Sequence, residues 1–246
     1  MDEKKTFGAR IPRTDMPCQA PAERVKNFKE VALGYTPEMA AAEASRCLQC
    51  KKPLCRTGCP VEVRIPEFIA KVAEGDIREA YRILRSTNSL PAVCGRVCPQ
   101  EKQCEGSCIL GKKGQPVAIG RLERYVADHA MAGACDTDKG CAAPRPDVRV
   151  ACIGSGPSSL TCAGYLAALG AKVTIFEGLH EPGGVLIYGI PSFRLPKDVV
   201  ARELDNLRAL DADIRTNWVG GRTVEVRQLL DEGYGAVFIG VGAGLP

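Results

Sequence analysis

The order of apolar and polar residues divides the chain into a helical first part and a second part in which strands and helices alternate. In the first part, apolar residues recur at helical spacing after two helix-start signals, Thr36 followed by proline and Asp76. Helices are predicted over 36–46, 66–74, 76–85 and 117–131. The first 35 residues carry three prolines and little periodicity, so we expect an irregular arm over 1–35 and a helical domain over 36–132.

After residue 148, short apolar runs alternate with helical segments. The predicted strands are RVACIG, KVTIFE, DIRTNW and AVFIGVG, and the predicted helices lie near 157–169, 196–210 and 224–230, with a long loop after the second strand. This alternation is typical of a parallel sheet covered on both faces. We therefore expect a linker over the Gly-, Pro- and Asp-rich stretch 133–147 and a Rossmann-like α/β domain over 148–246.

Composition narrows the class of protein. The 246 residues are 45% hydrophobic and 25% charged, which is ordinary for one or two globular domains. The net charge of +4 lacks the clustered basic excess of a nucleic-acid binder, and no apolar run reaches the roughly 18 residues of a membrane span. No apolar segment follows the charged N-terminus, so we expect a cytoplasmic protein that binds neither nucleic acid nor membranes.

Cysteine is the informative excess, because eight of the 13 lie between Cys47 and Cys108. In a reducing compartment, such density indicates metal rather than disulfides. The first group reads C-x2-C-x4-C-x3-C-P and the second C-x3-C-P-x4-C-x3-C. In ferredoxins, three closely spaced cysteines hold one 4Fe-4S cluster and a fourth, followed by proline, ligates the other cluster. We expect two such clusters, each completed by the other loop; structural zinc and unliganded thiols are the alternatives.

A glycine motif opens the predicted α/β domain. Gly154-Ser155-Gly156-Pro157-Ser158-Ser159 follows a strand and begins a helix, and Glu177 ends the next strand. Such glycines let the backbone approach a pyrophosphate at a helix N-terminus, and the acidic residue takes ribose hydroxyls. The third glycine is replaced by Ser159, so we expect looser packing there. The motif alone fits FAD or NAD; Glu177 disfavours a 2'-phosphate, and the long glycine-rich loop after it favours an extended ligand.

Five segments carry a resemblance to a known family: RCLQCKKPLCRTGCP, PAVCGRVCPQEKQCEGSC, AIGRLERYVAD, IGSGP and GIPSFRLP. Together they resemble the small (beta) subunit of NADPH-dependent glutamate synthase. They are also similar to the large subunit of NADH-dependent ferredoxin:NADP oxidoreductase and to the N-terminal region of dihydropyrimidine dehydrogenase. The resemblance implies a helical domain with two 4Fe-4S clusters, followed by an FAD domain into which an NAD(P)H domain is inserted.

The resemblance also implies a role for each site residue. One cluster would be held by Cys47, Cys50, Cys55 and Cys108, and the other by Cys59, Cys98, Cys104 and Glu123. Cys94 would then have no ligand role, although spacing alone would choose it over Glu123. The implied FAD-contacting positions are Gly154, Gly156, Pro157, Ser158, Glu177, Gly184, Val185, Arg194 and Val219. No residue is expected to act as a catalytic acid or base, because the cofactors carry the chemistry.

The implied function is electron transfer from NAD(P)H, through FAD and the clusters, to an FMN-containing synthase or another partner flavoprotein, with glutamate synthase first among them. The alternatives are a subunit of an electron-bifurcating transhydrogenase or sulfide dehydrogenase, and a non-enzymatic iron-sulfur carrier. Because the chain stops after AVFIGVGAGLP, we expect a fragment or split subunit that lacks the NAD(P)H site. A further hypothesis is that Lys51, Lys52, Lys112 and Lys113 dock an acidic partner; the alternative is that they are simply solvated.

Overall fold

The computed structural model describes residues 11–134 and 142–243, which form two compact units. Within the described residues, the helical unit comprises 11–19, 32–87 and 94–134. The sheet unit comprises 20–31, 88–93 and 142–243. The predicted order of a helical part and an α/β part is therefore confirmed. In the part of the chain that the structure covers, no helix has the length and apolar character needed to cross a bilayer.

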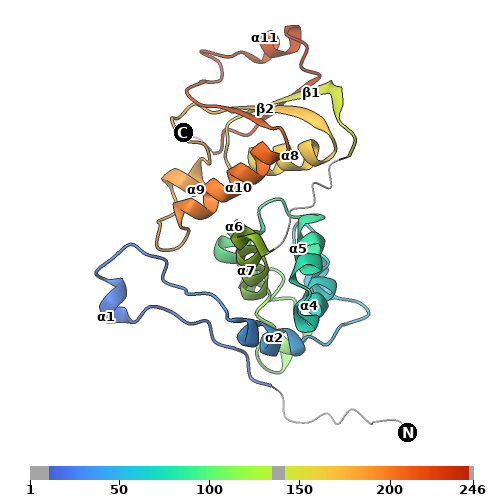
Figure 1. The fold of residues 1–246 in the computed structure, drawn as a ribbon, viewed down its shortest axis with the longest axis vertical. Helices are drawn as coiled ribbons and strands as arrows, with labels where there is room; N and C mark the ends of the chain where they lie inside the picture. The colour runs from blue at the N-terminus through green and yellow to red at the C-terminus, as the bar shows by residue number, and fades with distance from the viewer. Residues whose placement is uncertain (1–10, 135–141, 244–246) are drawn as a thin grey trace. The chain divides into compact units, whose positions relative to one another are not determined.

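Four helices build the core of the helical unit (Figure 1). They are α2 (Pro37–Ser45), α4 (Ile65–Glu74), α5 (Ile77–Arg85) and α7 (Ile119–His129). Phe68, Leu84 and Leu122 are fully buried in one apolar cluster that these helices share. Two predicted helix starts are confirmed, because Thr36 accepts a hydrogen bond from the Met39 N–H and Asp76 accepts one from the Glu79 N–H.

The cysteine-bearing segments hold only short helices that the sequence did not indicate. These are α3 (Leu54–Thr57), α6 (Pro91–Val97), η1 (Gln100–Lys102) and η2 (Ile109–Lys112). The helix predicted over 117–131 starts later, at α7, and passes into a π turn, η3 (Ala130–Ala134). The arm predicted to be irregular contains one short helix, α1 (Pro21–Arg24), and an antiparallel bridge between Cys18 and Ala32.

The sheet unit contains four parallel strands in the order β3-β2-β1-β4. They are β1 (Arg145–Ile153), β2 (Ala171–Phe176), β3 (Asp213–Arg215) and β4 (Ala236–Ile239). The linker predicted over 133–147 is wrong at its end, because Arg145 already pairs with Ala171. A register shift separates this pair from the regular ladder at Arg149, so the apolar pattern hides the start of the strand. Residues 135–141 of that linker lie outside the described residues.

Helices cover both faces of the sheet, as predicted. They are α8 (Pro157–Ala168), α9 (Val185–Tyr188), α10 (Lys197–Ala209) and α11 (Val226–Asp231). Figure 1 shows α8 and α10 on one side of the strands and α11 on the other. Ala151 and Ile153 of β1 share an apolar cluster with Leu229 of α11. The long loop predicted after β2 is not wholly irregular, because α9 interrupts it.

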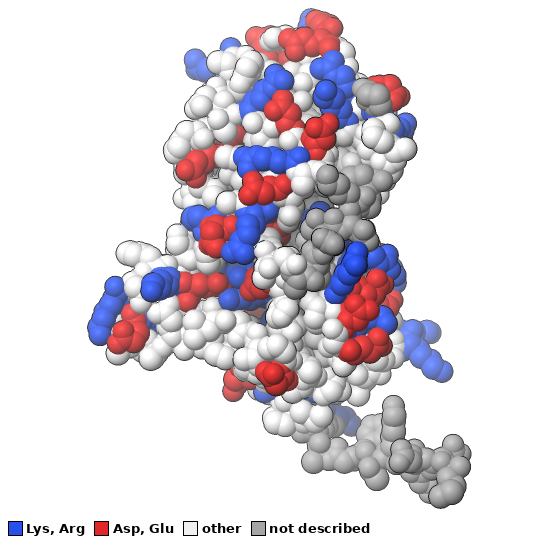
Figure 2. All heavy atoms as spheres, viewed as in Figure 1, with Lys and Arg blue, Asp and Glu red and all other residues white. Residues whose placement is uncertain are grey.

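Charge is mixed over the surface seen in Figure 2, where Lys and Arg alternate with Asp and Glu. This distribution agrees with the small net charge of +4. Surface charge therefore does not mark a functional site on this face.

Candidate cofactor sites

Four thiols of the helical unit line one cavity of about 80 Å³. Cys47 follows α2, Cys50 and Cys55 belong to the same loop, and Cys108 comes from the second cysteine group, directly before η2. The wall of the cavity is apolar and includes Ile65 and Ile69 of α4 among others. These four cysteines are the set that the family resemblance implies for one cluster. We refer to them below as the first thiol set.

The charges of these thiols influence one another. Burial raises the pKa of Cys47, and the neighbouring Cys50 and Cys108 raise it further. Burial likewise raises the pKa of Cys55 to about 11, with added contributions from Cys47, Cys108 and Cys50. Thiols of this kind carry protons at neutral pH in the absence of a cation, and iron binding would release those protons.

A second set combines Cys59 of the first group with Cys98 and Cys104 of the second and Glu123 of α7. Burial, followed by the charges of Glu123 and Cys59, raises the pKa of Cys98 to about 11. Burial also raises the pKa of Cys104, again with Glu123 as the strongest charged neighbour. Glu123 is itself buried on α7. The structure therefore brings the second implied ligand set together, which we refer to as the second ligand set.

Cys94 lies in α6, and its backbone carbonyl accepts a hydrogen bond from the Gln100 side chain at 2.9 Å. The two arginines that flank Glu123 bond to other groups: Arg121 donates to the Thr14 carbonyl and Arg124 to Asp128 and the Ala32 carbonyl.

Thiols make up most of both donor sets. Among the described residues, no three His, Cys, Asp or Glu side chains converge closely enough for a single metal ion. The first thiol set instead surrounds a cavity with apolar walls, and thiolate is the usual ligand of a 4Fe-4S cluster. The residues present therefore fit a cluster in the first set. The second set supplies three thiols and a carboxylate, which is a harder ligand.

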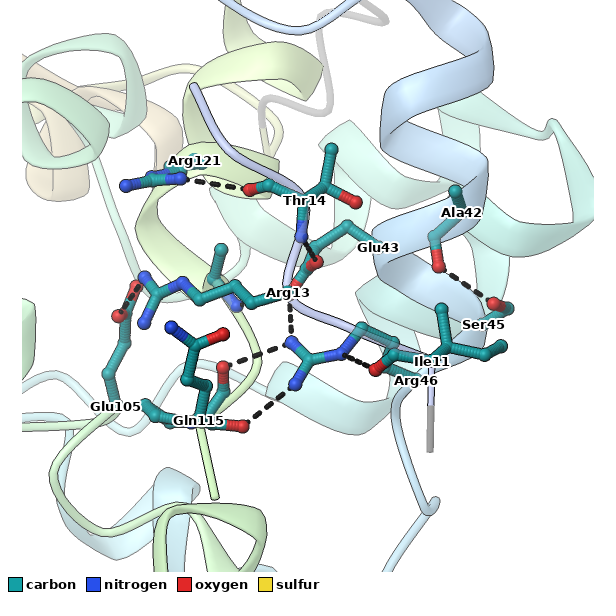
Figure 3. Close-up of polar contacts among 12 residues, drawn as sticks. Ile11, Arg13, Thr14, Ala42, Glu43, Ser45, Arg46, Glu105, Gln115 and Arg121 are labelled. Atoms are coloured by element: carbon teal, nitrogen blue, oxygen red, sulfur yellow. Dashed lines mark hydrogen bonds and ion pairs between the residues drawn. The ribbon is translucent and has the colours of Figure 1, made fainter. Parts of the chain in front are cut away.

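Figure 3 shows the polar contacts around Glu43, which lies close in sequence to the first cysteine group. Glu43 of α2 is fully buried. Its carboxylate accepts hydrogen bonds from the Thr14 N–H at 2.7 Å, the Ala118 N–H at 2.8 Å and the Arg46 guanidinium at 2.5 Å. Arg46 precedes Cys47 and also donates to the carbonyl of Gln115 at 2.8 Å. Glu43 therefore ties the start of the first cysteine loop to the residue that precedes α7.

A second carboxylate connects the N-terminal segment with the second ligand set. Glu105 follows Cys104 and accepts a charge-assisted hydrogen bond from Arg13 at 2.7 Å. Its other oxygen accepts from the Gly120 N–H of α7 at 3.1 Å. Sequence reasoning missed Arg13, Glu43 and Glu105, because isolated charged residues give no periodic or motif signal.

In the sheet unit, the carboxyl ends of β1, β2 and β4 meet at one edge of the sheet and border a groove of about 650 Å³. It is lined by eight of the predicted FAD-contacting residues: Gly154, Gly156, Pro157, Ser158, Glu177, Gly184, Val185 and Val219. Arg194 is exposed and lies outside this lining. Gly154 has a φ of 91°, and a Cβ there would lie 2.6 Å from the Gly240 carbonyl oxygen, so only glycine fits.

Ser155 organises the groove, although no role was predicted for it. The Glu177 carboxylate accepts hydrogen bonds from both the N–H and the hydroxyl of Ser155, and from the Leu179 N–H at 2.8 Å. The Ser155 hydroxyl in turn accepts from the Gly183 N–H at 2.8 Å. One buried hydroxyl therefore connects the glycine turn, the end of β2 and the glycine-rich loop. A serine inside a glycine motif was the only available signal.

The replacement of the third glycine by Ser159 is accommodated by another glycine. Ser159 is fully buried in α8, and its hydroxyl has no hydrogen-bond partner among the described residues. A Cβ on Gly240 would lie 2.2 Å from the Ser159 hydroxyl oxygen, so the absence of a side chain after β4 provides the space. The expected loosening is therefore replaced by a close contact between α8 and the end of β4.

Two known protein families match parts of the chain. Residues 24–135 match the family "Dihydropyrimidine dehydrogenase domain II, 4Fe-4S cluster". Residues 152–198 match the family "NAD(P)-binding Rossmann-like domain". The first match covers all the residues of both ligand sets, and the second covers the glycine turn and Glu177.

Among curated proteins, the chain is 42% identical over 227 residues to the glutamate synthase (NADPH) small chain of Halomonas elongata, covering 92% of this chain and 48% of that protein. It is 39% identical over 240 residues to the corresponding chain of Escherichia coli, covering 94% and 49%. The NAD-dependent dihydropyrimidine dehydrogenase subunit PreT of Salmonella typhimurium is 37% identical over 221 residues, covering 88% and 53%. The chain thus spans about half the length of these relatives.

The fold, the ligand sets and these matches define a 4Fe-4S domain followed by a Rossmann-like dinucleotide-binding domain. Within this class, the chain is similar to the glutamate synthase small chains over about half of their length, as its motifs predicted.

Proposed function

We propose that this chain is the electron-transfer part of an NAD(P)H-dependent iron-sulfur flavoprotein. The observation that carries the proposal is that each candidate site combines cysteines from both cysteine groups. Cys108 of the second group lines the cavity of the first thiol set, and Cys59 of the first group lies near Cys98 and Cys104. Two 4Fe-4S clusters bound in this crossed way would join both loops into one electron-transfer domain.

The groove of the sheet unit would hold FAD. FAD held there would supply the chemistry that couples hydride transfer from NAD(P)H to single-electron transfer. Gly154 and Gly156 let the backbone approach the pyrophosphate at the N-terminus of α8, where unpaired N–H groups favour negative charge. Glu177, held by Ser155, would accept hydrogen bonds from ribose hydroxyls and would repel a 2'-phosphate.

The helical unit would supply ligands and exclude water. Glu43 and Glu105 hold the backbone around both sets, so that the ligand side chains keep their places. Burial of Cys104 and Glu123 would shield the second cluster from solvent. Glu123, rather than Cys94, would complete that cluster.

The partner would be a flavoprotein subunit. Relatives named as glutamate synthase small chains favour an FMN-containing synthase that makes glutamate. A relative of similar identity is named as a dihydropyrimidine dehydrogenase subunit, so a second type of acceptor deserves a direct test. Electron delivery to each purified partner, measured side by side, would distinguish the two.

The first experiment is a cofactor analysis of the anaerobically purified chain. About eight iron and eight acid-labile sulfide per chain are expected for two clusters. After dithionite reduction, electron paramagnetic resonance should show both. Stoichiometric zinc without sulfide would contradict the proposal.

The ligand assignment has its own test. We expect Glu123→Ala to lose the signal of one cluster and Cys94→Ala to keep both. Cys18→Ser is the matched control, because Cys18 is exposed and belongs to neither set. Loss of a cluster in Cys94→Ala together with two intact signals in Glu123→Ala would reverse the assignment.

A further inference from the structure

We infer that the surface above the first thiol set is the docking face through which this chain passes electrons to a protein whose own docking surface is acidic. The docking face consists of Leu48, Leu54 and Ile109 with Lys52 and Lys112. This inference rests on the proposed electron-transfer function and adds which cluster meets the partner and what kind of surface it meets.

The centre of the docking face is apolar. The side chains of Leu48, Leu54 and Ile109 are 55%, 50% and 46% exposed. All three line the cavity that contains the first thiol set, so they form one patch rather than scattered residues. A contiguous apolar patch that a folded unit leaves in water is typical of a protein-protein contact.

The docking face also has a concave part. A more open hollow of about 520 Å³ shares Leu54 and Cys108 with the cavity of the first thiol set. Its remaining wall includes Gly106, Gly111 and Pro116, which offer backbone rather than long side chains. A protruding loop of a partner could enter this hollow and come close to Cys108.

The charged residues around the docking face determine which kind of partner surface it attracts. The charged residues that line the cavity and the hollow are Lys52, Lys112 and Glu105. Glu105 is neutralised by Arg13 at 2.7 Å, so the exposed charge is positive. No acidic residue occurs between Cys47 and Val61 or between Ser107 and Val117. An acidic partner surface is therefore attracted and a basic one is repelled.

The two ligand sets differ in their access to solvent. All four cysteines of the first thiol set are partly exposed. In the second ligand set, Cys59 and Cys98 are also partly exposed, but Cys104 is 7% exposed and Glu123 is 9% exposed. Because electron transfer slows steeply with distance, the cluster of the first set is the one that a docked protein reaches more closely.

The test uses the full chain with its clusters, reduced by dithionite and freed of excess reductant, and flavodoxin as the acidic probe. Each transfer removes one electron from the reduced chain and adds one electron to the flavin of oxidised flavodoxin. We expect the stopped-flow rate at low salt to fall about tenfold or more in Lys52→Glu/Lys112→Glu, and to fall with added salt in the unaltered chain. With cytochrome c, a basic probe, the same variant should react faster.

The matched control is Lys71→Glu/Arg82→Glu, which makes the same change in net charge on α4 and α5, where both residues pair with acidic neighbours. It should keep most of the flavodoxin rate. Carbodiimide cross-linking gives a readout independent of electron transfer: Lys52 and Lys112 should be joined to flavodoxin carboxylates. Leu54→Gln should lower the rate while keeping the salt dependence.

The outcomes distinguish a failure of the proposed electron-transfer function from a failure of the docking inference. A chain without iron and sulfide overturns the proposed function itself. If both clusters are present and reducible, but the control variant slows transfer as much as the docking-face variant, the inference is wrong. Cross-links that join Lys52 or Lys112 only to a second copy of this chain would also overturn it, because the patch would then be a self-association surface.

Discussion

The helical unit and the sheet unit present their candidate cofactor sites in opposite ways. In the helical unit, all the donors except Glu123 of α7 are thiols on loops and short helices, such as the segment from Cys47 to Cys59. In the sheet unit, the site is a groove of glycine backbone at the ends of hydrogen-bonded parallel strands. The first arrangement places thiols around a cavity, whereas the second is already organised by its own hydrogen bonds.

This difference predicts different dependence on cofactors. A metal centre that orders irregular segments contributes directly to the free energy of folding. A nucleotide that enters a formed groove adds only its binding free energy, which depends on its concentration. Loss of iron should therefore damage the helical unit and leave the sheet unit folded. Variants that affect only one unit should therefore separate the stability of the helical unit from that of the sheet unit.

The largest effect is expected from Cys55→Ser. The variant should lose about four of about eight iron atoms and show a clearly lower unfolding temperature of the helical unit, because the first cavity loses one of its four thiols. Far-UV circular dichroism would follow the helices. Trp218, the only tryptophan, packs edge-to-face with Phe176 in the sheet unit and reports that unit separately by fluorescence. Cys18→Ser is the control; an equal shift of the Trp218 transition would contradict the contrast between the units.

The next largest effect is expected from the buried carboxylate of Glu43. In Glu43→Ala, the Arg46 guanidinium keeps its buried position without its charged partner, which costs about 3–5 kcal/mol. The comparison variant, Glu74→Ala, removes a carboxylate from an exposed pair with Lys71 and should change the free energy of unfolding far less. Denaturant unfolding of the cluster-loaded protein would measure both. Equal costs would show that Glu43 does not hold the helical unit together.

The two units also differ in how much their sequence reveals. Local signals were sufficient where a single residue type determines a conformation: the caps at Thr36 and Asp76 are present, and the glycine turn forms the groove. The start of β1 was missed, because its register shift at Arg149 breaks the apolar alternation. The short helices in the cysteine segments were missed because their residues are chosen for ligand geometry rather than for helical periodicity.

The candidate sites, too, could be predicted only in part from the sequence. Spacing indicated two clusters, but the pairing of Cys108 with the first group depends on how the loops cross in three dimensions, and it came only from the family resemblance. Ser155, Glu43 and Glu105 act through contacts with residues distant in sequence, which one sequence does not display. Arg194 was expected at the groove and lies outside its lining.

A moderate effect is expected from Ser155→Ala in the sheet unit. The change removes one hydrogen bond to Glu177 and leaves the Gly183 N–H without its acceptor, at a cost of about 1–3 kcal/mol. FAD binding should weaken about tenfold, equivalent to about 1.4 kcal/mol, with the iron content unchanged. Ser192→Ala, in the loop before α10, is the control. Titration of flavin fluorescence measures the affinity; unaltered binding in Ser155→Ala would mean that Glu177 needs no such support.

The smallest change in the free energy of unfolding is expected from Ser159→Ala. Whether this variant is stabilised or destabilised is the informative result. The Ser159 hydroxyl is buried without a partner among the described residues, so its removal should stabilise the sheet unit by up to about 1 kcal/mol. The contact with Gly240 gives a second test. A methyl group at Gly240 would lie 2.2 Å from the Ser159 oxygen but 3.4 Å from its Cβ, so Gly240→Ala should cost less when Ser159 is already alanine. Trp218 fluorescence during denaturant unfolding would measure all four proteins of this cycle. Additive effects would mean that Gly240 does not compensate for the missing third glycine, and that the sheet unit accommodates Ser159 by a shift of α8 instead.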